Sequence, residues 1–360
     1  SDGQLLKTGH GTGQRCPNSH TVEESHLQSL SWTPWHHRLH QQLLTSPNLL
    51  PQGKTLVLAV SGGQDSMALL GLLRDLLPVH QWTLELWHGD HHWHPHSSQI
   101  AAELNRWCDG QNLPLQIDVA PEDLPQTEAD ARSWRYRCLT ELAHTHRADA
   151  VTGHTASDRA ETLLLQMSRG SDLAGLGSLR AMRPLQAHAP EGPQLRRPLL
   201  GFSRDETNQI CSDLQLPIWN DPGNQSTDFA RNRIRQEVMP VLEALYPGCN
   251  LRLAAMANRM AQHSDITQEL SQLALKGLMD GRTVRRRELG QLSTAARRCI
   301  LRTWIEQEGA TPPTAKILEQ LSHRLKTGQP AGHADLPNGW HLTWRDGSIE
   351  LTHTPHEQGP

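Results

Sequence analysis

The residues best suited to chemistry form the short segment Ser61-Gly62-Gly63-Gln64-Asp65-Ser66, which follows an apolar stretch. Its two glycines let the backbone turn tightly and approach a ligand without a clash from Cβ atoms. If a helix starts behind them, its free N–H groups and the positive end of its dipole face an anion. Asp65 repels phosphate unless a hard cation such as Mg²⁺ binds both groups. The sequence therefore predicts a phosphate-binding loop that holds Mg²⁺ through Asp65.

Two other nucleotide-binding patterns do not fit the sequence. Gly53-Lys54-Thr55 looks like the end of the mononucleotide loop G-x-x-x-x-G-K-[ST]. The first glycine of that loop would have to stand at position 48, which is Asn48, and a strand pattern follows where the loop requires a helix. Segment 61–66 is not a G-x-G-x-x-G fingerprint either. An ordinary glycine-rich turn between a strand and a helix is the remaining alternative.

The pattern S-G-G-x-D-S after an apolar strand resembles the loop of the N-type ATP pyrophosphatases, the PP-loop superfamily. Enzymes of that superfamily cleave ATP to AMP and pyrophosphate and activate a carbonyl oxygen as an adenylate. Further stretches resemble, in the right order, motifs of one family within it, the bacterial tRNA(Ile)-lysidine synthetases. They are residues 90–97, 131–136, 153–162, 197–200, 220–224 and 229–235. The resemblance covers residues 55–247 well and the remainder loosely.

The resemblance implies an ATP-dependent ligase that acts on an isoleucine tRNA with a CAU anticodon. The C2 carbonyl oxygen of the wobble cytidine attacks the α-phosphate of ATP, and pyrophosphate leaves. The ε-amine of L-lysine then attacks C2 and displaces AMP, which leaves lysidine in the tRNA. Adenylylation is needed because a carbonyl oxygen is a poor leaving group, whereas AMP is a good one.

The same resemblance implies that Asp158 and Glu161 help to hold lysine or the reacting cytosine. Their spacing of three residues places both carboxylates on one face at the start of a helix, and an ammonium group needs such a partner. Capping of the first helical turn by acids is the alternative. His154 is a candidate to contact phosphate or to relay a proton, or else has a structural role. Asp90 and His91 match the family in a strand-end loop near ATP.

This chain departs from the family pattern at several of these positions. In the third motif, Thr155, Ser157 and Arg159 replace a histidine, an aspartate and a glutamine. In the first motif, His92 and His94 replace a glycine and an arginine. Ser157 leaves less negative charge beside Asp158 than the family has.

Arginines supply the expected contacts with RNA. The candidates to hold phosphates of the anticodon stem-loop are Arg132, Arg135, Arg231, Arg233 and Arg235. The run Arg285-Arg286-Arg287 is a candidate to bind a more distant part of the tRNA. A run of like charges is also typical of a solvated surface, which is the alternative for these three residues.

Strands that alternate with helices must position these groups. The residue patterns predict strands at 55–60, 82–87, 115–119 and 150–153, and helices at 35–44, 66–77, 97–108, 129–144 and 158–168, with Pro78 ending the helix at 66–77. This alternation predicts an α/β fold with a doubly wound parallel sheet. In such sheets the ligand binds beyond the carboxyl ends of the strands.

The residue pattern and the distribution of charge divide the chain into four expected regions. We expect a disordered extension at 1–29, a PP-loop ATP pyrophosphatase domain at 30–228, a helical basic tRNA-binding domain at 229–330 and a small β-like tail at 331–360. The chain has a net charge of -4. Residues 229–302, however, contain 13 Lys and Arg against 6 Asp and Glu. A basic part on an acidic chain indicates a polyanionic partner.

Composition limits which classes of protein and which metal sites remain possible. No apolar run among the 360 residues approaches the roughly 20 that span a bilayer, so we expect no membrane association. The 6 cysteines form no C-x-x-C pair, which argues against a disulfide framework, a zinc knuckle or an iron–sulfur site and favours a reducing cytoplasm. The histidine-rich residues 88–96 offer metal-ligand types, but Gly89 and Pro95 favour a loop without fixed ligand spacing.

Two kinds of alternative function stay open at this point. One is another PP-loop enzyme, either a tRNA thiolase, which would want paired cysteines, or an amidotransferase-type synthetase, which would need a glutaminase partner. The other is a catalytically silent RNA-binding adaptor that keeps the fold. Oligomeric state is open as well, with a homodimer among the choices.

Overall fold

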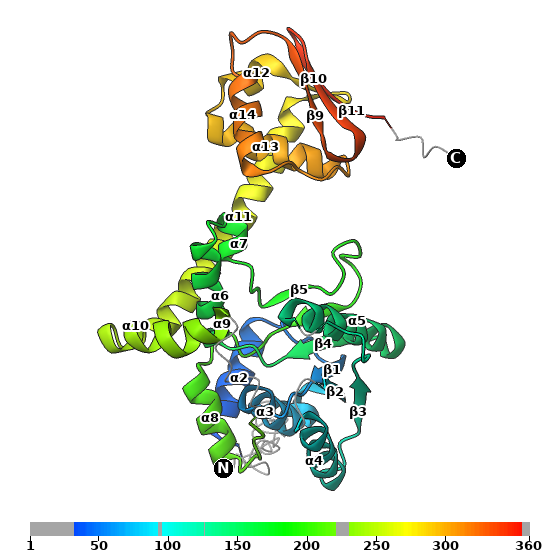
Figure 1. Ribbon diagram of the computed structural model, residues 1–360, viewed down its shortest axis with the longest axis vertical. Helices are drawn as coiled ribbons and strands as arrows, with labels where there is room; N and C mark the ends of the chain where they lie inside the picture. Colours follow the sequence, from blue (N-terminus) through cyan, green and yellow to red (C-terminus); the bar gives the residue numbers. More distant parts are fainter. Residues whose placement is uncertain (1–31, 93–95, 126, 221–229, 355–360) are drawn as a thin grey trace, which may run out of the picture. The chain divides into compact units, whose positions relative to one another are not determined.

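The computed structural model describes residues 32–92, 96–125, 127–220 and 230–354 (Figure 1). The expected extension at 1–29 lies outside the described residues. The chain divides into two compact units. The first combines Ser1–Glu161 with Arg180–Ala254, and the second combines Thr162–Leu179 with Ala255–Pro360. Within the described part, no helix is both long enough and apolar enough to cross a bilayer.

A six-stranded sheet with the order β3-β2-β1-β4-β6-β5 forms the centre of the first unit. The first five strands in this order are parallel, and β5 runs antiparallel to β6 at one edge. The strands are β1 (Thr55–Ala59), β2 (Thr83–Asp90), β3 (Leu115–Val119), β4 (Asp149–Thr152), β5 (Met182–Pro184) and β6 (Gln194–Arg196). The expected parallel sheet is confirmed.

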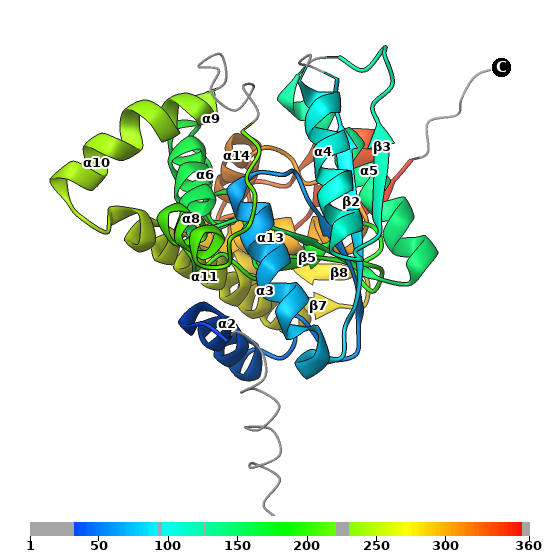
Figure 2. The ribbon, with the colours of Figure 1, turned by 90° about the horizontal axis from the view of Figure 1, so that it is seen from below.

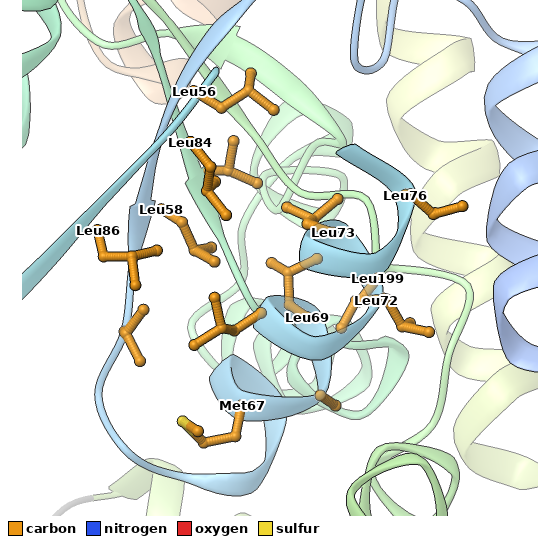
Figure 3. Close-up of a cluster of buried hydrophobic side chains, with 14 of the residues drawn as sticks. Leu56, Leu58, Met67, Leu69, Leu72, Leu73, Leu76, Leu84, Leu86 and Leu199 are labelled. Atoms are coloured by element: carbon orange, nitrogen blue, oxygen red, sulfur yellow. The ribbon is translucent and has the colours of Figure 1, made fainter. Parts of the chain in front are cut away.

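Helices cover both faces of this sheet. Leu56 and Leu58 of β1 are buried in a cluster with leucines of α3, as Figure 3 shows, whereas the intervening Val57 is buried in a second cluster with α5. Alternate residues of a strand point to opposite faces, so both faces are packed, as a doubly wound sheet requires. The helices are α2 (Pro34–Thr45), α3 (Gln64–His80), α4 (Ser97–Gly110), α5 (Glu128–His146), α6 (Ala156–Ser168), α8 (Arg204–Asp213), α9 (Ala230–Arg233), a π-helical turn (Ile234–Val238) and α10 (Met239–Leu245).

Two further helices, α2 and α8, pack against α3 (Figure 2). Leu39 and Leu43 of α2 and Ile210 of α8 share the core cluster with the leucines of α3. This packing places the first turn of α8 beside the first turn of α3, where the predicted phosphate loop ends.

The end of α3 differs from the expectation. Pro78 was expected to stop the helix, but α3 continues to His80 and ends at Gln81, whose φ of 57° is left-handed. A proline removes only its own N–H and disturbs the carbonyl one turn earlier. Because Pro78 lies in the last turn, a single hydrogen bond is lost, and the buried side chains of α3 outweigh that loss.

A second, antiparallel sheet with the order β7-β8-β11-β10-β9 characterises the second unit. Its strands are β7 (Met279–Asp280), β8 (Thr283–Arg285), β9 (Gly332–Leu336), β10 (Trp340–Trp344) and β11 (Ser348–His353). Its helices are α7 (Leu173–Leu176), most of α11 (Cys249–Leu278), α12 (Arg286–Gln291), α13 (Thr294–Gln307) and α14 (Ala315–Arg324).

One core unites this second unit. Trp304 of α13 and Trp344 of β10 are both 1% exposed and belong to the same buried cluster as Val284 of β8. Residues on both sides of the expected boundary at 330 therefore pack together. The hairpin of β7 and β8 was not anticipated, although Asp280-Gly281 is a hairpin-turn signal and Gly281 has a φ of 61°.

Candidate active site at the carboxyl ends of β1 and β4

The segment after β1 forms a tight loop that leads into α3. Gly62 has a φ of 83°, a left-handed conformation that favours glycine. Inside the loop, the Ser61 N–H donates to Oγ of Ser66 at 3.1 Å, and the Gly63 N–H donates to Oγ of Ser61 at 3.2 Å. The Trp219 N–H also donates to the Gly62 carbonyl at 2.9 Å. The loop is therefore preorganised at the start of α3, where a helix attracts anions.

The loop lies where the strand order of the sheet reverses. Strands β1 and β4 are adjacent in the sheet. Strands β2 and β3 follow on the side of β1, and β6 and β5 follow on the side of β4. Gly153, directly after β4, packs against the backbone of the first turn of α3. A Cβ at Gly153 would lie 2.9 Å from the Asp65 carbonyl oxygen and 3.0 Å from Cα of Ser66. Glycine at this position lets the two strand ends meet, which makes one site from two motifs.

Gln64 does not point its side chain at the loop centre. Its amide donates to the Arg204 carbonyl at 2.7 Å and to Oγ1 of Thr207 at 3.1 Å, and both acceptors belong to the start of α8. The side chain therefore fixes α8 to the loop. Gln64, like the two glycines, therefore offers only its backbone to a ligand.

Asp65 lies in a setting that favours a cation. Thr207 donates a hydrogen bond to its carboxylate, and the Arg204 guanidinium lies 3.5 Å away. Burial and the nearby charge of Asp158 nevertheless raise the pKa of Asp65 to about 6, against an ordinary 3.8. Burial therefore disfavours the charged form of Asp65 although the Arg204 guanidinium is near. A hard cation with oxygen ligands would relieve this, so the residues fit Mg²⁺.

Asp158 and Glu161 lie together in the first two turns of α6, as their spacing predicted. Glu161 has a side chain that is only 2% exposed. The Thr155 N–H donates to the Asp158 carboxylate at 2.8 Å, and the Asp158 N–H approaches Oγ1 of Thr155 at 3.4 Å. Asp158 therefore also caps its helix, so the capping alternative holds beside the functional one.

Two arginines of the chain bind these two carboxylates. Arg231 lies 2.9 Å from Asp158 and 3.0 Å from Glu161, and Arg235 lies 2.7 Å from Glu161 and 3.4 Å from Asp158. Burial opposes ionisation of Asp158, but the charge of Arg231 outweighs it and lowers the pKa of Asp158 to about 2. In this structure, guanidinium groups therefore occupy the position expected for a substrate ammonium. Arg231 and Arg235 were expected to meet RNA phosphates, and here they meet carboxylates.

His154 follows the end of β4, where the charges of Asp158 and of three arginines act on it. Its Nδ1 is 2.8 Å from Oγ1 of Thr152. Burial, together with the charges of Arg197, Arg231 and Arg132, lowers the pKa of His154 to about 3, although Asp158 acts in the opposite direction. The imidazole is therefore neutral near pH 7. It can exchange hydrogen bonds with a phosphate but cannot attract one by charge.

Asp90 and His91 lie at the end of β2 and support the loop that follows. Asp90 is 3% exposed and accepts hydrogen bonds from the His92 N–H at 2.9 Å and from Oγ of Ser98 at 3.0 Å. The His91 ring stacks edge-on against Trp134 at 5.1 Å. His91 and His92 line a cavity of about 340 Å³ between the ends of β2 and β3.

The metal alternative for the histidine-rich loop gains no support. Residues 93–95 lie outside the described residues. Within the part of the chain that is described, no group of three or more His, Cys, Asp or Glu side chains is placed to hold a metal ion. The residues expected at 221–224 and Phe229 are likewise outside the described residues.

The remaining arginines fall into exposed and buried sets. Arg135 and Arg287 are exposed, Arg285 is 44% exposed, and Arg233 pairs with Glu237 on the surface. Arg286 is 7% exposed, and its guanidinium donates to the carbonyls of Arg345, Gln329 and Pro330. The structure therefore gives Arg286 a structural role, in contrast to the tRNA contact expected from the sequence.

Several residues that shape the site carried no sequence signal. Thr207 and Arg204, which contact Asp65, come from a helix about 140 residues further along the chain. Asn250 donates to Oγ of Ser157 at 3.0 Å. The sequence shows the capping box Ser203 to Glu206 that starts α8, but not the place where that helix packs.

Known proteins share both parts of this architecture. Residues 35–242 match the family model of the PP-loop domain, and residues 285–348 match the TilS substrate binding domain. The chain is 56% identical over 323 residues to the tRNA(Ile)-lysidine synthase of Parasynechococcus marenigrum, covering 90% of this chain and 96% of that protein. It is 42% identical to the enzyme of the same name from Prochlorococcus marinus, covering 89% and 96%.

A solved structure supports the fold alone. The U34-tRNA thiolase NcsA from Methanococcus maripaludis aligns with a TM-score of 0.50 at 17% identity, covering 60% of this chain and 74% of that one.

Proposed function

Since the chain belongs to the tRNA(Ile)-lysidine synthase family, we propose how its own residues carry out that family's reaction. The chain is an ATP-dependent ligase that forms lysidine on tRNA. The observation that carries this conclusion is identity of 56% across 96% of a relative with that name. The thiolase, amidotransferase and silent-adaptor alternatives are not favoured, because relatives that match about nine tenths of this chain bear the name tRNA(Ile)-lysidine synthase.

We assign the triphosphate of ATP to the loop 61–66. The loop backbone, the hydroxyls of Ser61 and Ser66 and the start of α3 together present donors to an anion. Asp65, beside Thr207 and Arg204, would hold Mg²⁺, which supplies charge neutralisation for the departing pyrophosphate. The cavity at His91 and His92 is where we place the adenine.

The carboxylates of α6 serve the second half of the reaction. Lysine's ε-amine must lose a proton before it can attack C2 of the adenylylated cytidine. We assign orientation of this amine to Asp158 and Glu161, which already bind cations in the form of Arg231 and Arg235. Asp158, whose pKa is about 2, is a poor proton acceptor. Glu161 is therefore our candidate for the acceptor, once its arginines are displaced.

Recognition of tRNA requires a base to leave its stack and a surface to hold the backbone. Exposed Arg135 in the first unit and exposed Arg285 and Arg287 in the second are the arginines that we assign to phosphates. The second assignment agrees with the match of residues 285–348 to a substrate-binding domain.

Changing Arg285 and Arg287 together to Gln is expected to weaken tRNA binding and to reduce its dependence on salt. Each lost phosphate contact lowers the slope of log affinity against log salt by about 0.7–0.9. Filter binding between 50 and 200 mM salt measures this slope. Lys316→Gln, at an exposed position on α14, is the matched control. An unchanged slope in the double variant would assign both arginines to a solvated surface.

Changing Gly153 to Ala is expected to reduce ATP–pyrophosphate exchange by about 100-fold, because a misplacement of about 1 Å at a reacting centre has that cost. The new Cβ would lie 2.9 Å from a backbone oxygen of Asp65, so the loop must shift. Gly110→Ala is the control, since nothing lies within 4 Å of a Cβ there. Normal exchange in Gly153→Ala would show that the loop tolerates the shift.

Incorporation of radiolabelled lysine into tRNA tests the proposed function directly. The full chain is incubated with ATP, Mg²⁺, labelled lysine and an isoleucine tRNA transcript with a CAU anticodon. Nucleoside digestion should then release labelled lysidine. A transcript whose wobble base is uridine is the control and should stay unlabelled. Adenylylated tRNA without labelled product would contradict lysine as the amine.

A further inference from the structure

Three arginines converge on Tyr136 in the first unit. The guanidinium carbons of Arg132, on α5, and Arg183, on β5, each lie 4.9 Å from the centre of the Tyr136 ring. The charge of Arg197, which follows β6, also acts on Tyr136 and lowers the pKa of its phenol. Segments about 60 residues apart in the chain therefore bring three positive charges to one phenol.

The charge of this group has no counterion among the described residues. Arg197 is 1% exposed, its Nη1 donates to the Arg180 carbonyl at 2.6 Å, and its Nε has no hydrogen-bond partner. Within the described part of the chain, no ion pair joins Arg132, Arg183 or Arg197 to a carboxylate. Burying a guanidinium without an anion is costly. The Nε of Arg197 and the positive charge of the three arginines are therefore available to an anionic ligand.

Neighbouring groups respond to the same positive potential. Burial and the charges of Arg197 and Arg180 lower the pKa of Arg159 to about 10. Burial would raise the pKa of Tyr136, but the charges of Arg132 and Arg197 lower it instead. The charges of Asp158, Arg197 and Arg132 all act on His154. A basic group and an acidic pair thus adjoin through one histidine.

We propose that Tyr136, Arg132, Arg183 and Arg197 bind the α-carboxylate of the amino-acid substrate, an inference that rests on the function proposed above. Free lysine needs acidic groups around its side-chain ammonium and basic groups around its α-carboxylate. Guanidinium–carboxylate pairs are strong and directional. Arg197 is too buried to meet the backbone phosphate of a folded RNA, whereas Arg132 and Arg183 beside it are only partly buried. Arg132 then serves this subsite, in place of the RNA contact expected from the sequence.

Arg183→Gln tests the subsite, because Arg183 is only partly buried and its loss should spare the fold. Steady-state rates of the full chain with tRNA and ATP are measured with lysine and with lysinamide, which lacks the carboxylate charge. The KM for lysine is expected to rise about tenfold, as for a lost hydrogen bond to a charged group, and the KM for lysinamide to stay within about twofold. Tyr136→Phe should raise the lysine KM by a smaller factor. Arg137→Gln, exposed on the same helix, should change neither constant.

Three results would overturn the proposal. An equal rise in KM for lysine and lysinamide would mean that Arg183 only supports the fold. Weaker tRNA binding with a smaller salt slope and an unchanged lysine KM would assign the arginines to RNA phosphates. A change confined to the KM for ATP would assign them to the nucleotide. Failure of the wild-type chain to incorporate lysine at all would instead refute the proposed function.

Discussion

Changing Asp65 to Asn is expected to abolish tRNA-dependent ATP–pyrophosphate exchange, with a loss of at least about 100-fold, while tRNA affinity stays nearly unchanged. The amide keeps the shape of the side chain and its contact with Thr207 but removes the charge that would hold Mg²⁺. Exchange measured with labelled pyrophosphate gives the first quantity, and filter binding gives the second.

The same variant is expected to be more stable than the wild type at pH 8. The pKa of Asp65 in the folded protein is about 6, above its ordinary 3.8, so the folded chain holds a proton that the unfolded chain has lost. Stability from this group is therefore complete below about pH 4 and is lost as pH rises through 6. At pH 8 the loss is about 2–3 kcal/mol for a shift from 3.8 to about 6, and Asn removes it. Urea unfolding at pH 4 and pH 8 measures the difference.

A matched control separates the local effect from a general effect of charge. Asp205→Asn removes an exposed carboxylate in the first turn of α8, next to Arg204, and should alter neither exchange nor the pH dependence of stability. Wild-type exchange in Asp65→Asn would exclude the metal-binding role of this carboxylate. A loss of both exchange and stability would instead indicate a damaged fold.

Changing Glu161 to Gln is expected to block lysine transfer while adenylylation continues. Glu161 is the carboxylate that we assign to the incoming amine, and it belongs to α6, not to the phosphate loop. The variant should therefore retain ATP–pyrophosphate exchange and accumulate adenylylated tRNA, with lysine incorporation reduced by at least about 100-fold. Parallel exchange and incorporation assays on one preparation measure the two half-reactions.

This substitution also has a structural cost that must be separated from the catalytic one. Glu161 is almost fully buried between Arg231 and Arg235, and removing one partner of a buried pair costs about 3–5 kcal/mol. The double variant Glu161→Gln with Arg235→Gln restores the balance of charge and should recover much of the stability. If lysine transfer returns with stability, Glu161 has a structural role alone. If Glu161→Gln loses exchange as well, the assignment of adenylylation to the loop and of lysine transfer to α6 is wrong.

The paired arginines have a consequence for the order of events. Arg231 and Arg235 occupy the two carboxylates in this structure, at 2.7–3.4 Å. A substrate ammonium must therefore compete with them, or they must move when the polynucleotide arrives with its own phosphates. Either way, Asp158 is kept ionised in the absence of substrates, since its pKa is held near 2.

Local patterns in the sequence were sufficient for the loop and for β1 to β4, but they did not predict β5 and β6. The apolar run at 55–60, the two glycines and the helix pattern behind them predicted β1, the turn at Gly62 and α3 because strand, turn and helix signals act over a few neighbouring residues. The spacing of Asp158 and Glu161 predicted their common face for the same reason. The hairpin at Asp280-Gly281 also has a local signal, since Asp-Gly favours a tight hairpin turn.

Tertiary structure alone decided which charges meet. The sequence presents Arg231, Arg235, Arg286 and Arg197 as similar cations, yet two of them bind carboxylates, one donates to backbone carbonyls and one is buried on a tyrosine. Their partners lie from about 40 to more than 70 residues away in the chain. A charge interacts with whatever packing brings within a few ångströms, and no local pattern encodes that distance. Burial then decides the effect of each contact. An exposed ion pair adds little to stability, whereas a buried one shifts the pKa values of its members and affects ligand binding.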